Sequence, residues 1–215
     1  MPLLSNDIDN VHRYCDRDLP AMDWYLERFD FVGDKELREH IAKEFMAARY
    51  ISKLGEALNV VDEKLHAHCK FQIVQYASIY EAVIVYLLWE NYSDHKAVIE
   101  IEYHYAYKLA GSVPNNINIT NNDGEEIFLC AKRNEKTSRH SIKFQDKVDA
   151  SVKIGFLEKE LAEEIKEFYS LRNALHLETA AKKSIKYELE QSRLAYLRMK
   201  PFVDKIKETE GVGTK

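Results

Sequence analysis

The feature that most constrains the fold is a long apolar stretch in the middle of the chain, residues 62–91. Apolar side chains recur there every three or four residues, at Leu65, Cys69, Ile73, Tyr76, Tyr80, Val83 and Leu87. This period places them on one face of an α-helix. Beyond Phe71 they cover nearly every face, as is typical of a central helix packed on several sides. The most apolar run, residues 82–89, is shorter than the roughly 20 residues that cross a bilayer, so we expect a buried helix and no membrane contact.

The rest of the chain also favours helices. It holds only 7 glycines and 4 prolines, too few for a fold built from many tight turns. Residues 1–33 are expected to form a short acidic helix or arm, and a helix is predicted from Asp34, a suitable N-cap, to near Asn59. Three further helices are predicted: one capped by Ser141 and ended by Gly155, one over residues 161–171, and one that starts at about Glu178, in which Pro201 either introduces a kink or starts a new turn.

Between these helices the sequence predicts a small β insert at about residues 105–133. Residues 94–109 fit both a helical and a strand period, so we expect a helix that gives way to a strand near Tyr105. Residues 117–120 and 126–131 have the pattern of short strands, and residues 121–124 supply a turn between them. The predicted fold is mainly α, with an N-terminal helical extension, residues 1–60, and a helical domain, residues 61–210, that carries a β-hairpin.

The charge of the chain limits how it can bind a polyanion. The formal net charge is −5, which argues against a protein covered with positive charge, so any phosphate-binding surface must be local. The one strongly basic run starts at residue 132, and we expect these residues to contact RNA: Lys132, Arg133, Lys136, Arg139 and Lys143. The alternative is a solvated loop beside the hairpin. The sequence leaves both open.

Cysteine usage and the N-terminal sequence predict a cytoplasmic protein. The three cysteines, Cys15, Cys69 and Cys130, are widely spaced and odd in number, which fits a reducing compartment, and the first residues lack the pattern of a signal peptide. No metal or other cofactor is expected, because the histidines near two of these cysteines match no standard zinc spacing; they are His12, His66 and His68. Tyr103, Tyr105 and Tyr107 are expected to serve core and subunit packing rather than base stacking.

The chain carries one set of residues suited to phosphate chemistry, Arg172, Asn173 and His176. If this segment is helical, Arg172 and His176 lie on one face, about one turn apart. Histidine gives and takes protons near neutral pH, and arginine holds two phosphate oxygens. His176 can then act as general acid or base on a ribose 2′-hydroxyl while Arg172 holds the phosphate and Asn173 orients a reacting group. The ordinary alternative is that Arg172 pairs with a glutamate while His176 packs beside Leu175 and Leu177.

Three segments together resemble the HEPN superfamily. They are Tyr76-Ala77-Ser78-Ile79-Tyr80-Glu81-Ala82 in the central helix, Ile142-Lys143-Phe144-Gln145-Asp146-Lys147 at the start of a helix, and Leu171-Arg172-Asn173-Ala174-Leu175-His176. The resemblance covers roughly residues 60–200. It implies an antiparallel helical bundle and a homodimer in which arginine and histidine from two protomers meet in a cleft. It also implies that Arg172 contacts phosphate, that Asn173 is the polar residue following it, and that His176 is the catalytic histidine.

The resemblance leaves two functions open. Many members of the superfamily are metal-independent endoribonucleases of toxin–antitoxin, CRISPR and anti-phage systems, which implies RNA as substrate and a protein antitoxin or regulator as partner. The active pattern has a longer spacing between arginine and histidine, whereas here only Asn173, Ala174 and Leu175 intervene. Moving a residue by one position along a helix turns its side chain by about 100°, so we expect the shorter spacing to point His176 in another direction than the histidine of an active member. The alternative function is therefore a non-catalytic, dimeric interaction or nucleotide-binding module.

Overall fold

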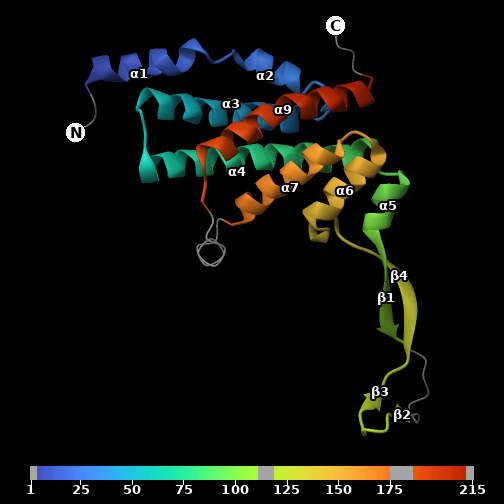
Figure 1. Ribbon diagram of the computed structural model, residues 1–215. Coiled ribbons are helices and arrows are strands. Elements are labelled where there is room, and N and C mark those ends of the chain that lie inside the picture. The colour runs from blue at the N-terminus through green and yellow to red at the C-terminus, as the bar shows by residue number, and fades with distance from the viewer. Residues whose placement is uncertain (1–3, 111–118, 175–185, 212–215) are drawn as a thin grey trace.

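In the computed structural model, which describes residues 4–110, 119–174 and 186–211, a long central helix organises the chain (Figure 1). This helix, α4 (Asp62–Tyr86), continues into a π-helical turn, Leu87–Asn91. It packs against α3 (Lys35–Ala57), α7 (Lys159–Asn173) and α9 (Leu189–Thr209). Both the predicted central helix and the helix that follows Asp34 are confirmed. The Asp34 side chain accepts a hydrogen bond from the Leu37 amide at 3.1 Å, as an N-cap does.

The core around α4 holds the C-terminal helices in place. Tyr80 is fully buried, and its hydroxyl donates to the Ala195 carbonyl of α9 at 2.8 Å. Its ring meets Phe202 of α9 edge to face at 4.9 Å between centroids and lies nearly parallel to Phe168 of α7 at 6.0 Å. One side chain of α4 therefore contacts both helices, and this fixes the position of α7, which carries Arg172.

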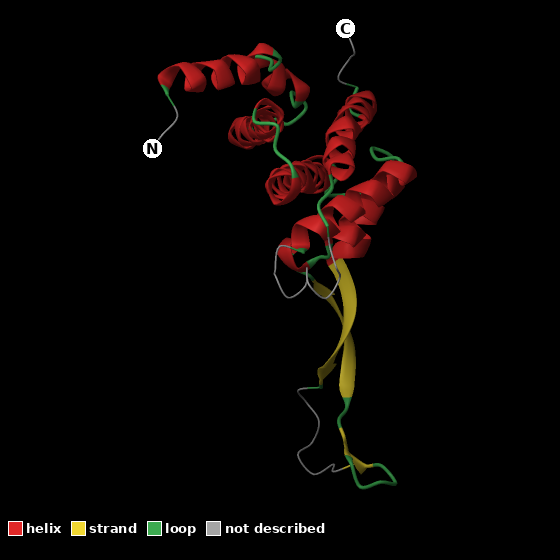
Figure 2. Cartoon of the chain, turned by 60° about the vertical axis from the view of Figure 1, so that its left-hand side comes forward, coloured by secondary structure: helices red, strands yellow, loops and turns green. Residues whose placement is uncertain are grey.

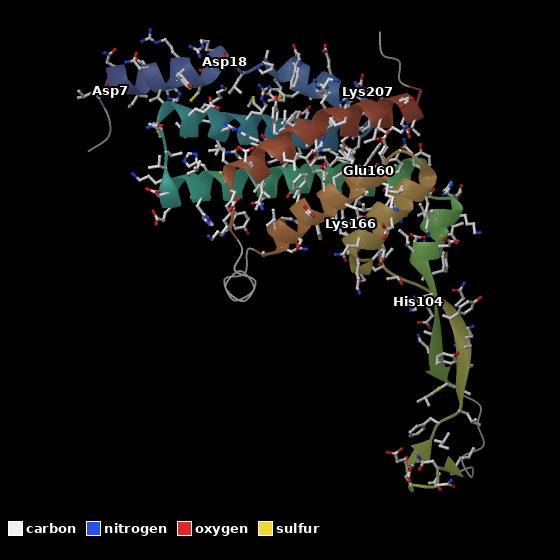
Figure 3. The ribbon with its side chains drawn as sticks, in the orientation of Figure 1. Asp7, Asp18, His104, Glu160, Lys166 and Lys207 are labelled. Carbon is white, nitrogen blue, oxygen red and sulfur yellow. The ribbon has the colours of Figure 1, made fainter. Side chains whose placement is uncertain are left out.

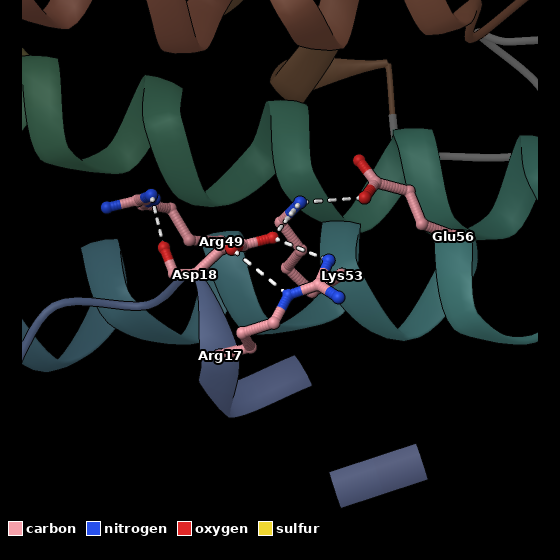
Figure 4. A network of polar contacts seen from close by, with 5 residues as sticks. All are labelled: Arg17, Asp18, Arg49, Lys53 and Glu56. Atoms are coloured by element: carbon pink, nitrogen blue, oxygen red, sulfur yellow. Dashed lines mark hydrogen bonds and ion pairs between the residues drawn. The ribbon is translucent and has the colours of Figure 1, made fainter. Parts of the chain in front are cut away.

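Two helices, α1 (Ser5–Arg17) and α2 (Met22–Arg28), precede α3 and pack against it. Lys53 of α3 pairs with Asp18, the C-cap of α1, at 3.4 Å, and this contact fixes the end of α1; Lys53 also pairs with Glu56 of its own helix at 2.8 Å (Figure 4). Tyr25 of α2 belongs to the same buried cluster as Tyr80. The boundary expected near residue 60 falls in the connection between α3 and α4, and the core crosses it; the division into two units stays a prediction.

The β insert is a ribbon that projects from one end of the helical body (Figures 1 and 2). The short helix α5 (Lys96–Glu102) runs directly into β1 (Tyr103–Leu109), which pairs antiparallel with β4 (Cys130–Lys136). The register places Tyr103 opposite Lys136 and Leu109 opposite Cys130. Farther out, β2 (Ile119–Thr120) pairs with β3 (Glu126–Ile127). The chain is thus mainly helical with a small antiparallel β element.

The predicted β-hairpin is confirmed at its turn and over a short antiparallel pairing of its strands. Asn121 accepts hydrogen bonds from the Asp123 and Glu125 amides at 3.0 and 2.8 Å, but the strands on either side of this turn pair over just two positions. The principal ladder instead joins β1 to β4, and the helix gives way to strand at Tyr103 rather than at Tyr105. The first part of the basic run, residues 132–136, was predicted to be either a segment that contacts RNA or a solvated loop; it forms part of the strand β4. Both faces of β4 meet solvent, so it lacks the apolar alternation that marks a half-buried strand.

Two helix starts differ from the prediction. Ser141 lies in a 3-10 turn, Arg139–Ser141, and α6 (Phe144–Ile154) starts after Lys143, so Ser141 is not its N-cap. The predicted stop at Gly155 is confirmed, because its φ of 103° is a conformation that glycine adopts without strain. The last helix was expected from about Glu178, but Lys186–Glu188 are not helical. α9 starts at Leu189 with a capping box formed by Glu188 and Gln191.

Burial of the central helix bears on the membrane and thiol predictions. Asp62–Asn91 is long and apolar enough to span a bilayer, but 56% of its most apolar window lies inside the chain, as in the core helix of a soluble protein. All three cysteines are free; Cys15 and Cys69 are buried and Cys130 is exposed. Burial raises the pKa of the Cys15 and Cys69 thiols, which keeps them protonated and unreactive.

Candidate functional site

Arg172 lies in the last turn of α7 and is held by an ion pair. Its Nη1 is 3.0 Å from Oε2 of Glu81 on α4, and its side chain is 31% exposed against 25% for Glu81. Its guanidinium also lies 5.3 Å from the ring centroid of Tyr169, one turn earlier on α7. The ordinary alternative, an arginine paired with a glutamate of a neighbouring helix, therefore describes Arg172. The same contacts orient the guanidinium and leave it partly open to solvent.

The other two residues of the predicted catalytic set are placed differently. Asn173 is the last residue of α7 and is exposed. His176 lies outside the described residues, so its distance from Arg172 and its catalytic role stay predictions. The structure therefore places Asn173 next to the Arg172–Glu81 pair at the end of a helix.

Lys147 of α6 is a buried lysine on the same side of the bundle. Only 6% of it is exposed, and its Nζ lies 5.5 Å from the centroid of the Trp89 indole. Burial lowers the pKa of Lys147, and the charge of Glu81 partly opposes this. Within the described residues no carboxylate is within 4.0 Å of Nζ. The sequence analysis did not predict the burial of Lys147; a signal for it is its position three residues after Phe144 and four before Ser151, both buried.

We expect the Lys147→Met variant to be as stable as the natural protein or more stable by about 1–2 kcal/mol, because methionine fills the same space without a desolvated charge. Urea denaturation followed by circular dichroism measures this. Lys153→Met, on the exposed side of the same helix, is the control and should change stability by less than about 0.5 kcal/mol. A clear loss of stability in Lys147→Met alone would contradict the prediction and show that the ammonium group stabilises the fold.

A second polar cluster joins the ribbon to the helical body. The buried Glu102 carboxylate accepts a hydrogen bond from Trp89 Nε1 at 2.7 Å and pairs with Lys136 of β4 at 3.0 Å. Burial alone would raise the pKa of Glu102, but these two hydrogen bonds and the charges of Lys136 and Arg139 outweigh it and hold the pKa below its usual range. Trp89, Glu102, Lys136 and Arg139 line an open cavity of about 450 Å³. Glu102 is a functional candidate that the sequence analysis missed.

All five residues predicted to contact RNA are exposed: Lys132, Arg133, Lys136, Arg139 and Lys143. Three of them lie on β4, where Lys132 Nζ is 4.0 Å from the Tyr105 ring centroid and Lys136 Nζ is 5.6 Å from that of Tyr103. The prediction that these tyrosines pack in the core is wrong, since they lie on the exposed ribbon, whereas their packing between subunits stays a prediction. Both faces of this ribbon meet solvent.

Contacts between aromatic and cationic side chains run through both clusters. Tyr169, which underlies Arg172, stacks on Phe144 at 4.0 Å, and Lys147 in the next turn of α6 lies against Trp89. Trp89 also lies 5.6 Å from the Arg139 guanidinium and donates to Glu102, which binds Lys136. Figure 3 labels Lys166, which lies on α7, and His104, which lies at the start of the ribbon. These contacts form two groups, one from Arg172 to Phe144 and one from Lys147 to the base of the ribbon, and Phe144 and Lys147 lie one turn apart on α6.

The histidines considered as metal ligands have other contacts. His68 Nδ1 is 3.2 Å from the Ile51 carbonyl oxygen, and the His66 ring meets Tyr187 edge to face. His12 lies 3.3 Å from the Tyr50 hydroxyl. Among residues 4–110, 119–174 and 186–211, no group of three or more histidine, cysteine or acidic side chains is arranged to hold a metal ion.

The function of this chain has to be derived from its own residues and their geometry. Arg172 with Glu81, Lys147 beside Trp89, and the exposed cations of the ribbon are the groups from which a function must be derived. Comparison of the chain with models of protein families, with curated proteins and with solved structures finds no match.

Proposed function

We propose that this protein binds RNA along the surface that runs from Arg172 to the β-ribbon, and that it is a HEPN-like, metal-independent endoribonuclease. The observation that carries the proposal is that positive groups are held in place at both ends of this stretch, Arg172 by Glu81 and Tyr169, and the exposed cations Arg139 and Lys136 by Trp89 and Glu102. In a chain of net charge −5, clustered cations supply the attraction for a phosphate backbone. Arg172, Asn173 and His176 then form the cleavage centre at one end of this surface.

The Arg172–Glu81 pair suits a group that must bind phosphate in a fixed orientation. A guanidinium offers five N–H donors, and one carboxylate oxygen at 3.0 Å engages only part of that capacity. Charge-assisted bonds to a phosphate are shorter and about twice as strong as neutral hydrogen bonds. Arg172 would hold the phosphate while His176 moves the proton of the 2′-hydroxyl, as in acid–base cleavage without a metal. The resemblance to HEPN proteins adds a homodimer and a protein regulator of a toxin–antitoxin or anti-phage system as proposed partners.

A second function has one observation in its favour. Glu81 neutralises the Arg172 charge within the protomer, as expected for a structural ion pair in a protein that only binds its ligand. With the short spacing to His176, this supports a non-catalytic, dimeric module that binds a protein or a nucleotide. The two functions differ in whether RNA is cut.

Cleavage of structured RNA in the presence of EDTA tests the proposal. The natural protein should cut the RNA, and Arg172→Ala and His176→Ala should each lower the rate by at least about 100-fold, the usual effect of losing a general acid–base or charge-stabilising group. Arg198→Ala is the matched control, because Arg198 also pairs with a glutamate of another helix, Glu164, at 2.7 Å. It should cut RNA at the natural rate. Gel electrophoresis of end-labelled RNA gives the rates.

The other outcomes decide between the functions. RNA that is bound but left intact by the natural protein would reject the enzyme and retain RNA binding. Equal cleavage by the natural protein, Arg172→Ala and His176→Ala would assign the activity to another site or a contaminant. Failure of the natural protein to bind RNA would reject RNA as its ligand and leave the non-catalytic module.

A further inference from the structure

One face of the ribbon presents a row of tyrosines to solvent. Tyr103, Tyr105 and Tyr107 alternate along β1 and therefore point to the same side, and they are 40, 65 and 71% exposed. The residues opposite them on β4 are, in order, Lys136, Asn134 and Lys132. Since directly opposed residues share a face of an antiparallel pair, these six side chains form one surface, here named the tyrosine face.

Charge is divided unequally between the two faces of the ribbon. Glu135, the one carboxylate within β1 and β4, lies opposite His104 on the other face and pairs with Lys108 at 2.5 Å. The tyrosine face carries two lysines and an asparagine but no acidic residue. Lys132 lies over the Tyr105 ring at 4.0 Å, and among the described residues it makes no ion pair. The tyrosine face thus combines aromatic surface with positive charge, and its ligand should be planar and anionic.

We propose that the tyrosine face binds single-stranded RNA by stacking bases on Tyr105 and Tyr107 while Lys132 and Lys136 contact the phosphates. This inference rests on the proposed RNA binding and deepens it by naming the binding element and the substrate class. Aromatic side chains stack on any base, and nearby cations follow the backbone, which is the usual way proteins hold single strands. Asn134 adds a donor and an acceptor for a base edge.

The geometry of β1 favours an unpaired strand over a duplex. Tyrosines two residues apart on one strand are separated by about 6.8 Å, which is twice the rise of about 3.4 Å per nucleotide along a duplex strand. Neighbouring rings therefore match bases that have been drawn apart, as in an extended single strand. The flat faces of paired bases are covered by their neighbours, so a duplex offers the rings nothing to stack on.

Binding of a fluorescein-labelled uridine dodecamer, measured by fluorescence anisotropy, tests the inference. Replacing both Tyr105 and Tyr107 with alanine should weaken binding by at least about 25-fold, since each lost ring costs about 5-fold or more. Replacing both with phenylalanine keeps the rings and should retain affinity within about 2-fold. Circular dichroism shows whether both variants remain folded; because the two rings are exposed, we expect them to be.

Two lysine variants separate the faces. Lys132→Gln and Lys108→Gln each remove one positive charge from the ribbon, but from opposite faces. Lys132→Gln should weaken binding and lower the slope of log affinity against log salt by about 0.7, the value for one phosphate contact on a single strand. Lys108→Gln should leave the slope unchanged. If RNA bound the other face instead, Lys108→Gln would lower the slope and Lys132→Gln would leave it unchanged.

The remaining outcomes distinguish failure of the inference from failure of the proposed function. If the natural protein binds RNA but the alanine variant binds equally well, RNA binding stands and the tyrosine face is not its site. If a duplex of the same length binds more tightly than the single strand, the substrate class is wrong. If the alanine variant dissociates a dimer in sedimentation and keeps its RNA affinity, the face is a subunit interface. A deoxyuridine dodecamer bound as tightly as the RNA would identify single strands in general as the ligand and overturn selectivity for RNA.

Discussion

Replacing Tyr80 with alanine should lower the free energy of unfolding by about 3–5 kcal/mol, the largest effect expected of any single change discussed for this chain. The side chain is fully buried, meets Phe202 edge to face, and bonds the Ala195 carbonyl. The variant loses the buried ring, leaves a cavity between α4, α7 and α9, and leaves that carbonyl without its donor. Urea denaturation followed by circular dichroism gives the free energy.

The Tyr80→Phe variant separates packing from hydrogen bonding. It keeps the ring and removes only the hydroxyl, so stability should fall by about 1 kcal/mol. If Tyr80→Ala costs no more than Tyr80→Phe, the ring would contribute nothing to stability, and the packing of α7 and α9 on α4 described above would be contradicted. The result bears on function because this packing positions Arg172.

Replacing Glu102 with alanine should lower the free energy of unfolding by about 2–4 kcal/mol. The change removes the acceptor of the buried Trp89 indole N–H and the partner of Lys136, the two contacts that fix the base of the ribbon. Glu100→Ala is the matched control on the same helix: its carboxylate makes only surface pairs, with Lys96 and Lys153, so it should cost less than about 1 kcal/mol. Equal losses in the two variants would contradict the account of the ribbon base.

Acid should abolish the contribution of Glu102. Because its pKa in the folded protein lies below that of an unfolded glutamate, the folded state binds fewer protons, and stability falls as the pH falls. The contribution is complete above the unfolded pKa of about 4.3 and is lost as the pH drops through the lower, folded value. From neutral pH to about pH 3, the natural protein should therefore lose more stability than Glu102→Gln does. Parallel pH profiles of the two proteins would contradict this assignment.

The long helices could be predicted from the sequence because their patterns are local. The periodicity of residues 62–91 and the N-cap at Asp34 need no knowledge of distant contacts, and both were correct. The β1–β4 ladder could not be predicted this way, because it pairs residues as far apart as Tyr103 and Lys136 and buries neither face. A ribbon of this kind has no apolar side from which its register can be read.

The candidate site was predicted in part. Arg172 was identified by residue type, and the structure adds its partner, Glu81, on a helix distant in sequence. The burial of Lys147 was not predicted, because it lies among basic residues in the sequence. The tyrosines of β1 were correctly recognised as aromatic residues with a polar end, but such residues occur in cores and on binding surfaces alike. Only the arrangement of the strands shows that they face solvent.

Photochemical cross-linking shows which residues RNA contacts, and so tests whether RNA binds along the surface from Arg172 to the tyrosine face. The protein would be irradiated with RNA containing 4-thiouridine and digested, and the cross-linked peptides would be identified by mass spectrometry. We expect cross-links in Tyr103–Leu109 or Cys130–Lys136 and in the last turn of α7, which includes Arg172. Cross-links confined to α1, α3 or α9 would contradict it.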